Sequence, residues 1–577
     1  MKPKASIIIP AYDATLGITA KNEYDLAHSD IFNTLSYDDI IGYFGSKEGA
    51  INYYKETLAS GYPRSAAFLI SKIIKELIAA SRNDEAQQMI LEDLSMLSEN
   101  MMETGVDILV TKAARPSNRK KVMFSSAQWL TGGMERVMSI LFNELKDDYE
   151  IFLITPYDER HSHIAIPDFV NSIKISYDLF ANSFDSIILS YSLLLDIDVV
   201  IGYMNMFEKQ LNFYNICVGT KVKTIASNHE YYFYPYKSPG QYNAVRKRLD
   251  AFTNCDAIIW PLNFNAALCG MYVDNNYVIA NPNNLNFIST SLKKSTDKTV
   301  LCVGRFNDYV KRIDRILECF SLVLKEIPDA KLVLVGKYEK HVPFKQSDYG
   351  TVNDLITRLA IPESNIEFVG EVDNVQDYYS QADVLLLTSN SEGFGMVVNE
   401  AAQFGVPTVC NYIPGIEDLV IDGENGFITA QDDIKSMAAR VCKILTDDTL
   451  QEKLGTNAKR KVEKFDAKLI GDKWRFLIRS LIEIKDEDKL RKKLEGKLKY
   501  EIEDEKLFTQ VLAKELNEIF YMAIDRKPQL SKYNLILLKA VQMRHRLRTN
   551  IKYEGIIKTI SKAVTRSYRI AKAKLTR

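Results

Sequence analysis

The chain has 577 residues, of which 46% are hydrophobic and 26% charged, and its formal net charge is −1 at pH 7. The length predicts more than one domain, and the composition is that of a soluble globular protein with enough apolar side chains for a large core. Because the chain as a whole has no excess of positive charge, nucleic acid is not an expected partner.

Cysteine usage and hydropathy restrict the cellular location. The cysteines are odd in number, widely spaced and without a C-x-x-C pair, which predicts buried, reduced thiols rather than disulfides or a metal site. The N-terminal apolar run is too short for a signal peptide, and the apolar region from Ser186 to Met206 is interrupted by Asp196 and Asp198. We therefore expect a cytoplasmic protein without a membrane-spanning segment. The cysteines are Cys217, Cys255, Cys269, Cys302, Cys319, Cys410 and Cys442.

Residues 1–117 form an N-terminal accessory region that we expect to be largely helical. Between Ser46 and Gly105 apolar residues recur every three or four positions, which is typical of helices that bury one face. No residue pattern in this region indicates a reaction, so we expect it to contact a partner or to pack on the rest of the chain. The polar stretch Arg115–Lys120 separates it from the first α/β region.

Residues 118–290 alternate short apolar strands with helical stretches, which predicts a parallel sheet with right-handed crossovers. Residues 291–464 repeat this alternation without a long spacer. We therefore expect two tandem Rossmann-like α/β domains with a cleft between them. The strands expected in the first domain are Val122–Ser125, Ile151–Thr155, Ile173–Tyr177, Val199–Tyr203, Lys223–Ser227, Ala257–Trp260 and Tyr277–Ala280. Those expected in the second are Val300–Val303, Lys331–Val335, Ile366–Val369, Val384–Thr388, Thr408–Cys410 and Phe427–Thr429.

Gly132 and Gly133 lie between the first strand and a helix expected from Met134 to Leu145. Bare backbone at a helix N-terminus favours an anion, although a tight turn is the simpler explanation of a glycine pair. Later in the same domain, His229 follows the strand Lys223–Ser227. Its place at the carboxyl end of a parallel strand favours a role in positioning and polarising a ligand over a purely structural hydrogen bond.

Two cations follow the first strand of the second domain, where Gly304 and Arg305 are succeeded by Lys311. Arg305 can chelate two phosphate oxygens while Lys311 acts as a point charge, so together they can stabilise a departing diphosphate without a metal. The D-x-D pair Asp196 and Asp198 precedes its strand instead of following it, so we do not expect it to hold a metal.

The stretch from Asp383 to Val409 is a strand, a polar loop, a helix from about Met396 to Phe404 and a second strand. In the loop, Gly393 and Gly395 flank Phe394, so that backbone N–H groups as far as Met396 and Val397 can approach a ligand closely. Two carboxylates, Glu392 and Glu400, bracket the turn. Carboxylates accept hydrogen bonds from paired hydroxyls, which suits a sugar nucleotide.

We expect residues 465–485 to form one helix. We expect residues 486–577 to form a helical C-terminal extension, with a charged helix at Lys489–Lys506. Residues 544–577 carry eleven Lys or Arg against one acid, Glu554, and their apolar residues share one helical face. A basic amphipathic helix of this kind can lie on an anionic membrane surface, dock on an acidic partner or pack on its own core.

The block S-E-G-F-G-x₄-E-A around Glu392 and Glu400 resembles the signature of retaining GT-B glycosyltransferases of family 4 (glycosyl transferases group 1). The segments G-G-x-E-R-V at Gly132, G-R-F at Gly304 and N-P at Asn281 are similar to further motifs of that family. The resemblance covers about Val122 to Ile484. It implies GT-B architecture, with an acceptor-side first domain, a donor-side second domain and residues 465–485 crossing back to the first domain.

The resemblance also implies roles for the site residues. Glu392 would bind hydroxyls of the donor sugar, Glu400 both ribose hydroxyls, and His229 the sugar near the reacting centre. Gly132 and Gly133 would contact the donor phosphate, and Arg305 and Lys311 the diphosphate. The interval before the lysine is one residue longer than in some members, so Arg312 is an alternative to Lys311. No cofactor is implied.

The expected reaction is sugar transfer from a nucleotide-sugar donor to a glycan, lipid-linked or protein acceptor, in the synthesis of a bacterial-type surface polysaccharide, teichoic acid or glycoconjugate. The location would be the cytoplasm or, through residues 544–577, the inner face of the plasma membrane. Two alternatives remain: a non-catalytic GT-B subunit that binds an acceptor or partner, and a GT-B phosphorylase, although no motif for a lysine-bound cofactor is present.

Overall fold

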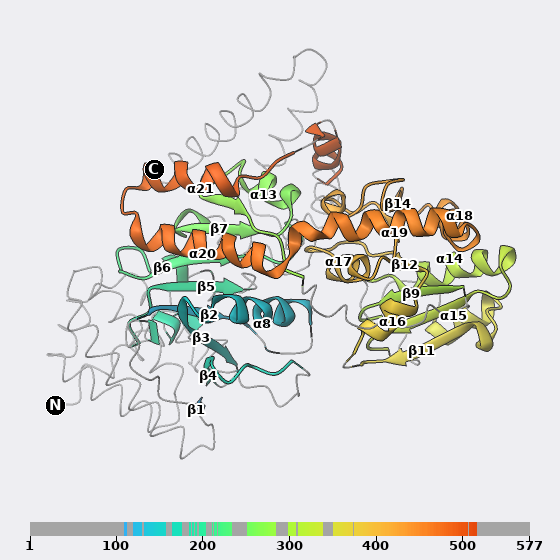
Figure 1. Cartoon of the computed structure of the whole chain (residues 1–577), viewed down its shortest axis with the longest axis horizontal. Helices are drawn as coiled ribbons and strands as arrows, with labels where there is room; N and C mark the ends of the chain where they lie inside the picture. Colours follow the sequence, from blue (N-terminus) through green and yellow to red (C-terminus); the bar gives the residue numbers. More distant parts are fainter. Residues whose placement is uncertain are drawn as a thin grey trace, which may run out of the picture.

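The computed structural model describes residues 109–515, apart from several short gaps and the longer gaps 112–118, 157–163, 176–183, 204–210, 233–247, 284–297 and 339–349. Most of the expected accessory region and the whole basic segment 544–577 lie outside the described residues. Within the described part, two α/β domains lie side by side (Figure 1).

The first domain is built on an eight-stranded sheet with the strand order β1-β4-β3-β2-β5-β6-β7-β8. All of its neighbouring strands pair in parallel except β1, which adds an antiparallel edge beside β4. The strands are β1 (Leu109–Thr111), β2 (Lys120–Ser125), β3 (Tyr149–Pro156), β4 (Asn171–Ile175), β5 (Val199–Tyr203), β6 (Lys223–Ser227), β7 (Ala257–Trp260) and β8 (Asn276–Val278).

The second domain is built on a six-stranded, fully parallel sheet with the order β11-β10-β9-β12-β13-β14. The strands are β9 (Thr299–Val303), β10 (Lys331–Val335), β11 (Ile366–Gly370), β12 (Val384–Leu387), β13 (Thr408–Asn411) and β14 (Gly426–Thr429). The prediction of two tandem Rossmann-like parallel-sheet domains is therefore confirmed.

Helices cover both faces of each sheet, which explains why the strands read as continuous apolar runs. In β2, Val122 and Phe124 pack toward α8 while Met123 packs toward the opposite face. The α-helices are α8 (Gly133–Leu145), α13 (Asn263–Cys269), α14 (Ile313–Glu326), α15 (Val352–Arg358), α16 (Gln376–Gln381), α17 (Met396–Gln403), α18 (Ile434–Thr446), α19 (Asp448–Val462), α20 (Ala467–Glu483) and α21 (Glu487–Leu498). The 3₁₀ turns are η2 (Glu363–Asn365), η3 (Ile416–Asp418) and η4 (Glu463–Phe465).

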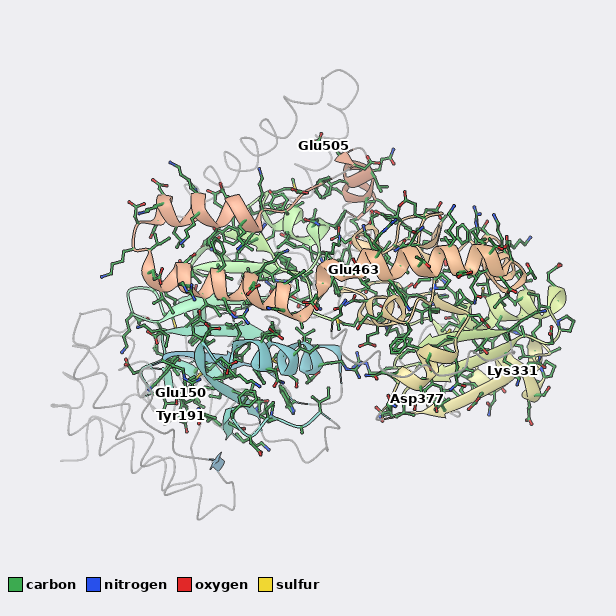
Figure 2. All side chains as sticks on the ribbon, viewed as in Figure 1. Glu150, Tyr191, Lys331, Asp377, Glu463 and Glu505 are labelled. Carbon is green, nitrogen blue, oxygen red and sulfur yellow. The ribbon has the colours of Figure 1, made fainter. Side chains whose placement is uncertain are left out.

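The chain returns to the first domain after α19. Helix α19 lies over the second domain, and α20 lies over the first (Figure 1). Glu463, in η4, marks the crossing between them (Figure 2). Arg475 of α20 then binds Asp148 at 2.8 Å and the carbonyl oxygen of Glu144 at 2.8 Å, which fastens α20 to the end of α8. Crossing back in this way joins the two domains by packing as well as by the linker.

The seven cysteines are free thiols, and all except the partly buried Cys442 are buried, as the sequence predicts. Burial raises the pKa of Cys269 to about 12. Among the described residues, no helix is both long and apolar enough to cross a membrane.

Candidate active site

The loop between β12 and α17 has a fixed backbone. Gly395 is the N-cap of α17 with φ of 93°, a left-handed conformation that favours glycine. Phe394 is buried with its ring edge-on to Phe465, at a centroid distance of 5.4 Å. The side chain of Phe394 therefore anchors the loop, and what this position can offer a ligand is its backbone. The first N–H groups of a helix have no partner within it, so the start of α17 can receive an anion.

Lys311 and Glu392 form an ion pair beside this loop, with 2.7 Å between Nζ and Oε1. The segment before α14 is held to the end of β12, because the Thr388 hydroxyl donates to the carbonyl oxygens of Lys311 and Arg312 at 3.0 and 3.1 Å. The guanidinium of Arg312 instead binds Asp314, at 2.6 Å for the shortest contact. Lys311 and Arg312 were the two candidates for the second cation predicted to bind the diphosphate. Of these two, Lys311 is the one that contacts Glu392.

The carboxyl ends of β9 and β10 present bare backbone to each other. A Cβ on Gly336 would collide with the carbonyl oxygen of Gly304, and the amide of Gly304 donates to the Val335 carbonyl at 3.0 Å. The side chain of Lys311 packs over Gly304. Arg305 follows and is exposed. The predicted diphosphate cations therefore lie at one strand end, one exposed and the other paired with Glu392.

His229 lies where the first domain meets the Glu392–Gly395 loop. A Cβ on Gly393 would collide with the carbonyl oxygen of His229, so the two backbones are in direct contact. The His229 ring stacks on Tyr203 at 4.8 Å, and its Nε2 lies 2.9 Å from the Ser227 hydroxyl. Its Nδ1 is buried without a hydrogen-bond partner among the described residues. Burial lowers the pKa of His229 to about 4, so the imidazole is neutral at pH 7.

The glycine pair of the first domain also contacts the second domain. A Cβ on Gly133 would come within 3.3 Å of Met396 Cγ, at the first residue of α17. Gly132 is the N-cap of α8, in an extended conformation. The structure thus places two predicted anion-binding helix starts, those of α8 and α17, next to each other.

Glu400, on α17, is bound from both domains. Its Oε1 accepts a hydrogen bond from Nη1 of Arg136 at 2.6 Å, and its Oε2 accepts one from the Tyr379 hydroxyl at 2.8 Å. Arg136 is in the first turn of α8 and Tyr379 is on α16. Neither residue was predicted from the sequence; the available signal was that Arg136 directly follows the glutamate of the G-G-x-E-R-V segment.

The segment Asn281–Asn283 joins the two domains. Asn283 donates from Nδ2 to the Val462 carbonyl at 2.8 Å, and its amide donates to the Phe465 carbonyl at 2.7 Å. Asn281 Nδ2 lies 3.6 Å from the Met396 sulfur. These contacts place the segment where the two domains are connected.

Asp196 forms an ion pair with Lys221, and Asp198 and Glu230 also make contacts that are structural. Asp198 accepts from the Lys121 amide at 2.8 Å and from Lys120 at 2.7 Å, before β5 begins. Glu230 forms an ion pair with the buried Arg248 at 2.5 Å. No group of three or more His, Cys, Asp or Glu side chains that could hold a metal ion occurs in the part of the chain that is described.

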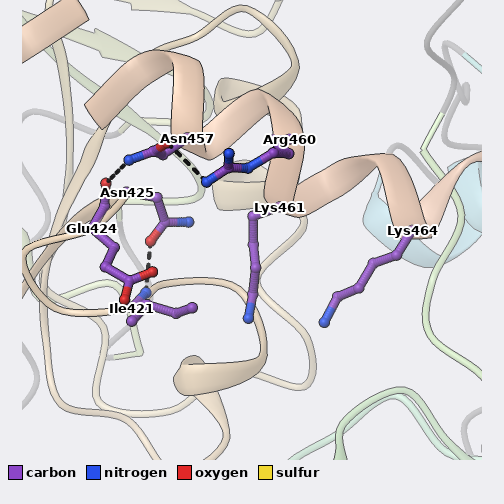
Figure 3. A pocket seen from close by; sticks show the side chains of 7 residues that line it. All are labelled: Ile421, Glu424, Asn425, Asn457, Arg460, Lys461 and Lys464. Carbon is purple, nitrogen blue, oxygen red and sulfur yellow. Dashed lines mark hydrogen bonds between the residues drawn. The ribbon is translucent and has the colours of Figure 1, made fainter. Parts of the chain in front are cut away.

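A separate cavity of about 290 Å³ opens on the second domain, beside the last turn of α19 (Figure 3). Its lining includes three cations, Arg460, Lys461 and Lys464, and one carboxylate, Glu424. Basic residues complement the dipole at a helix C-terminus, which accounts for this cluster. The cavity shares no residue with the predicted donor site.

Comparison with known proteins identifies the second domain. Residues 285–461 match the family model described as "Glycosyl transferases group 1". A structure of Anabaena Alr3699/HepE in complex with UDP and glucose aligns with a TM-score of 0.53 and 18% identity over 63% of this chain and 100% of that chain, which shows the fold. These findings support a GT-B glycosyltransferase.

Two curated relatives differ in how much of their own length this chain covers. It is 28% identical over 359 residues to an "Uncharacterized glycosyltransferase" of Haemophilus influenzae, covering 60% of this chain and 96% of that protein. It is 30% identical over 187 residues to the "Poly(glycerol-phosphate) alpha-glucosyltransferase" of Bacillus subtilis, covering 32% of this chain and 26% of that protein. The shorter match spans about a quarter of the Bacillus protein.

Proposed function

We propose that the protein is a retaining, metal-independent glycosyltransferase of family 4 that uses a nucleotide sugar. The acceptor would be a glycan, a lipid-linked sugar or a protein, in the synthesis of a surface polysaccharide, teichoic acid or glycoconjugate. Relatives named for polymer glycosylation, such as the Bacillus poly(glycerol-phosphate) enzyme, support this class of acceptor. The site of action would be the cytoplasm or the inner face of the plasma membrane.

One observation carries the proposal: the direct contact between His229 of the first domain and Gly393 of the second. It puts the backbone of His229, whose imidazole is neutral, against the loop that carries Glu392, and Glu392 is already paired with Lys311. In the proposed reaction, Glu392 binds the sugar hydroxyls, and Arg305 and Lys311 stabilise the departing diphosphate. His229 positions the sugar. The acceptor hydroxyl oxygen bonds to the anomeric carbon from the face that the diphosphate leaves, and its proton passes to the departing diphosphate.

The test is a hydrolysis screen of the full chain with UDP-, GDP-, ADP- and dTDP-sugars, followed by anomer analysis of the released sugar. We expect one nucleotide class to be hydrolysed with retention of configuration, and hydrolysis to persist in excess EDTA. Binding of no nucleotide in calorimetry would favour the non-catalytic subunit instead. Turnover with sugar phosphates in place of nucleotide sugars would favour a phosphorylase.

A further inference from the structure

The carboxylate of Glu400 is held by one donor on each oxygen. Arg136 donates to Oε1 and Tyr379 to Oε2, at 2.6 and 2.8 Å. Glu400 itself is largely buried, with 15% of its side chain exposed, whereas Arg136 is 40% exposed. The plane of the carboxylate is therefore fixed from two directions, and by two domains.

Both donors keep their protons at neutral pH. Burial raises the pKa of Tyr379 well above its usual value, and the neighbouring Glu400 carboxylate raises it further. The same carboxylate raises the pKa of Arg136. Tyr379 is also rigid, since its ring is buried and stacks on Phe404 at a centroid distance of 5.8 Å. Glu400 thus faces two permanent donors.

Two hydrogen bonds do not saturate a carboxylate. Each oxygen carries two lone pairs, so one acceptor position remains on Oε1 and one on Oε2. Two remaining positions, one on each oxygen, match the two neighbouring hydroxyls of a ribose. The charge-assisted bond from Arg136 also fixes the orientation of these positions more firmly than a neutral donor would.

We propose that Arg136 and Tyr379 are positioning residues for the nucleotide, which orient Glu400 so that its free acceptor positions receive the 2′- and 3′-hydroxyls of the donor ribose. This inference rests on the proposed function. Because Arg136 belongs to α8 of the first domain, ribose recognition by the second domain depends on contact between the domains. The nucleotide then binds most tightly to the conformation in which the two domains meet.

The experiment is isothermal titration of the full chain with UDP, GDP and ADP, then with the 2′-deoxy form of the nucleotide that binds best. In Arg136→Gln we expect affinity for the ribonucleotide to fall about tenfold, as for loss of a charged hydrogen bond. The preference for ribose over 2′-deoxyribose should fall toward one. Affinity for inorganic pyrophosphate should not change. Tyr379→Phe should reduce the same preference, and Arg136→Lys should restore part of it.

Arg475→Gln is the matched control. It removes an arginine that also holds two segments together, through Glu144 and Asp148, but does not touch Glu400. It should leave the ribose preference at its wild-type value. An unchanged preference in Arg136→Gln would overturn the inference, and tighter binding would show that Arg136 competes with the ribose. If the wild-type chain binds none of the three nucleotides and also hydrolyses no dTDP-sugar, the proposed function fails as well, so the two failures are distinguishable.

Discussion

Lys311 Nζ lies 2.7 Å from Glu392 Oε1, with 18% and 14% of the two side chains exposed. These are the cation proposed to bind the diphosphate and the carboxylate proposed to bind the sugar. The two groups neutralise each other in a partly buried place, where a lone charge would be costly. In the proposed reaction the donor would either reorganise this pair or join it, and either event would link recognition of the sugar to stabilisation of the leaving group.

Lys311→Ala should reduce kcat by about a hundredfold or more, because it removes a preorganised charge from the leaving group. The measurement is turnover of the nucleotide sugar found in the hydrolysis screen, with circular dichroism to check the fold. Lys298→Ala is the control, since Lys298 is in an exposed pair with Asp329 at 3.5 Å in the same domain. Wild-type turnover in Lys311→Ala would contradict the assignment.

Gly393→Ala should separate the two domains at the site. The added methyl group would collide with the His229 carbonyl oxygen, and relieving such overpacking typically costs about 1–3 kcal/mol. We expect a lower melting temperature and a loss of transfer activity. The control is Gly496→Ala in α21, where no atom lies within 4 Å of the added methyl group. That change should stabilise the helix by about 0.5–1 kcal/mol. Equal melting temperatures of Gly393→Ala and the wild type would show that the contact is dispensable.

Removing residues 544–577 should weaken binding to vesicles that contain phosphatidylglycerol. Eleven basic residues on an amphipathic segment favour an anionic surface, and salt should weaken the binding further. Co-sedimentation with phosphatidylglycerol and with neutral phosphatidylcholine vesicles measures the effect. A truncated chain that sediments like the full one would leave packing or a protein partner as the role of this segment.

The central strands were predictable because they are buried on both faces. The sequence predicts the observed bounds of β5, β6, β7 and β10. A short apolar run flanked by polar residues is typical of a strand that helices cover on both faces. β1 was not predicted. It has three residues and pairs antiparallel at the sheet edge, so neither length nor alternation signals it. The helix expected at Lys489–Lys506 ends at Leu498, where the chain turns so that Tyr500 packs beside Gly270.

The candidate site was predictable where a local motif supplies it. Glu392, Gly393 and Lys311 were predicted in this way, because strand ends and glycine turns have local signatures. The partners of Glu400 were not found. Arg136 is 264 positions away in sequence and Tyr379 is 21, and no spacing rule relates a helix of one domain to a helix of another. A contact that depends on how two domains meet requires the structure.

His229 should make the protein less stable in acid. Its pKa is about 4 in the folded chain against 6.5 for the free side chain, because burial disfavours the imidazolium. Between these values the unfolded chain binds the extra proton and the folded chain does not. Stability is therefore complete above pH 6.5 and is lost as the pH falls toward 4. The contribution lost between about pH 7.5 and about pH 4.5 is about 2–3 kcal/mol.

His229→Gln tests this, since glutamine keeps hydrogen-bonding capacity but does not titrate. Urea denaturation measures the unfolding free energy of the wild type relative to that of the variant. We expect this difference to decrease by about 2–3 kcal/mol between about pH 7.5 and about pH 4.5. The other five histidines, none of which the structure describes, are unchanged in both proteins and cancel in the difference. A wild-type-minus-variant difference that stays constant across this range would mean that the ring is solvated, and the neutral, polarising role proposed for His229 would then lose its physical basis.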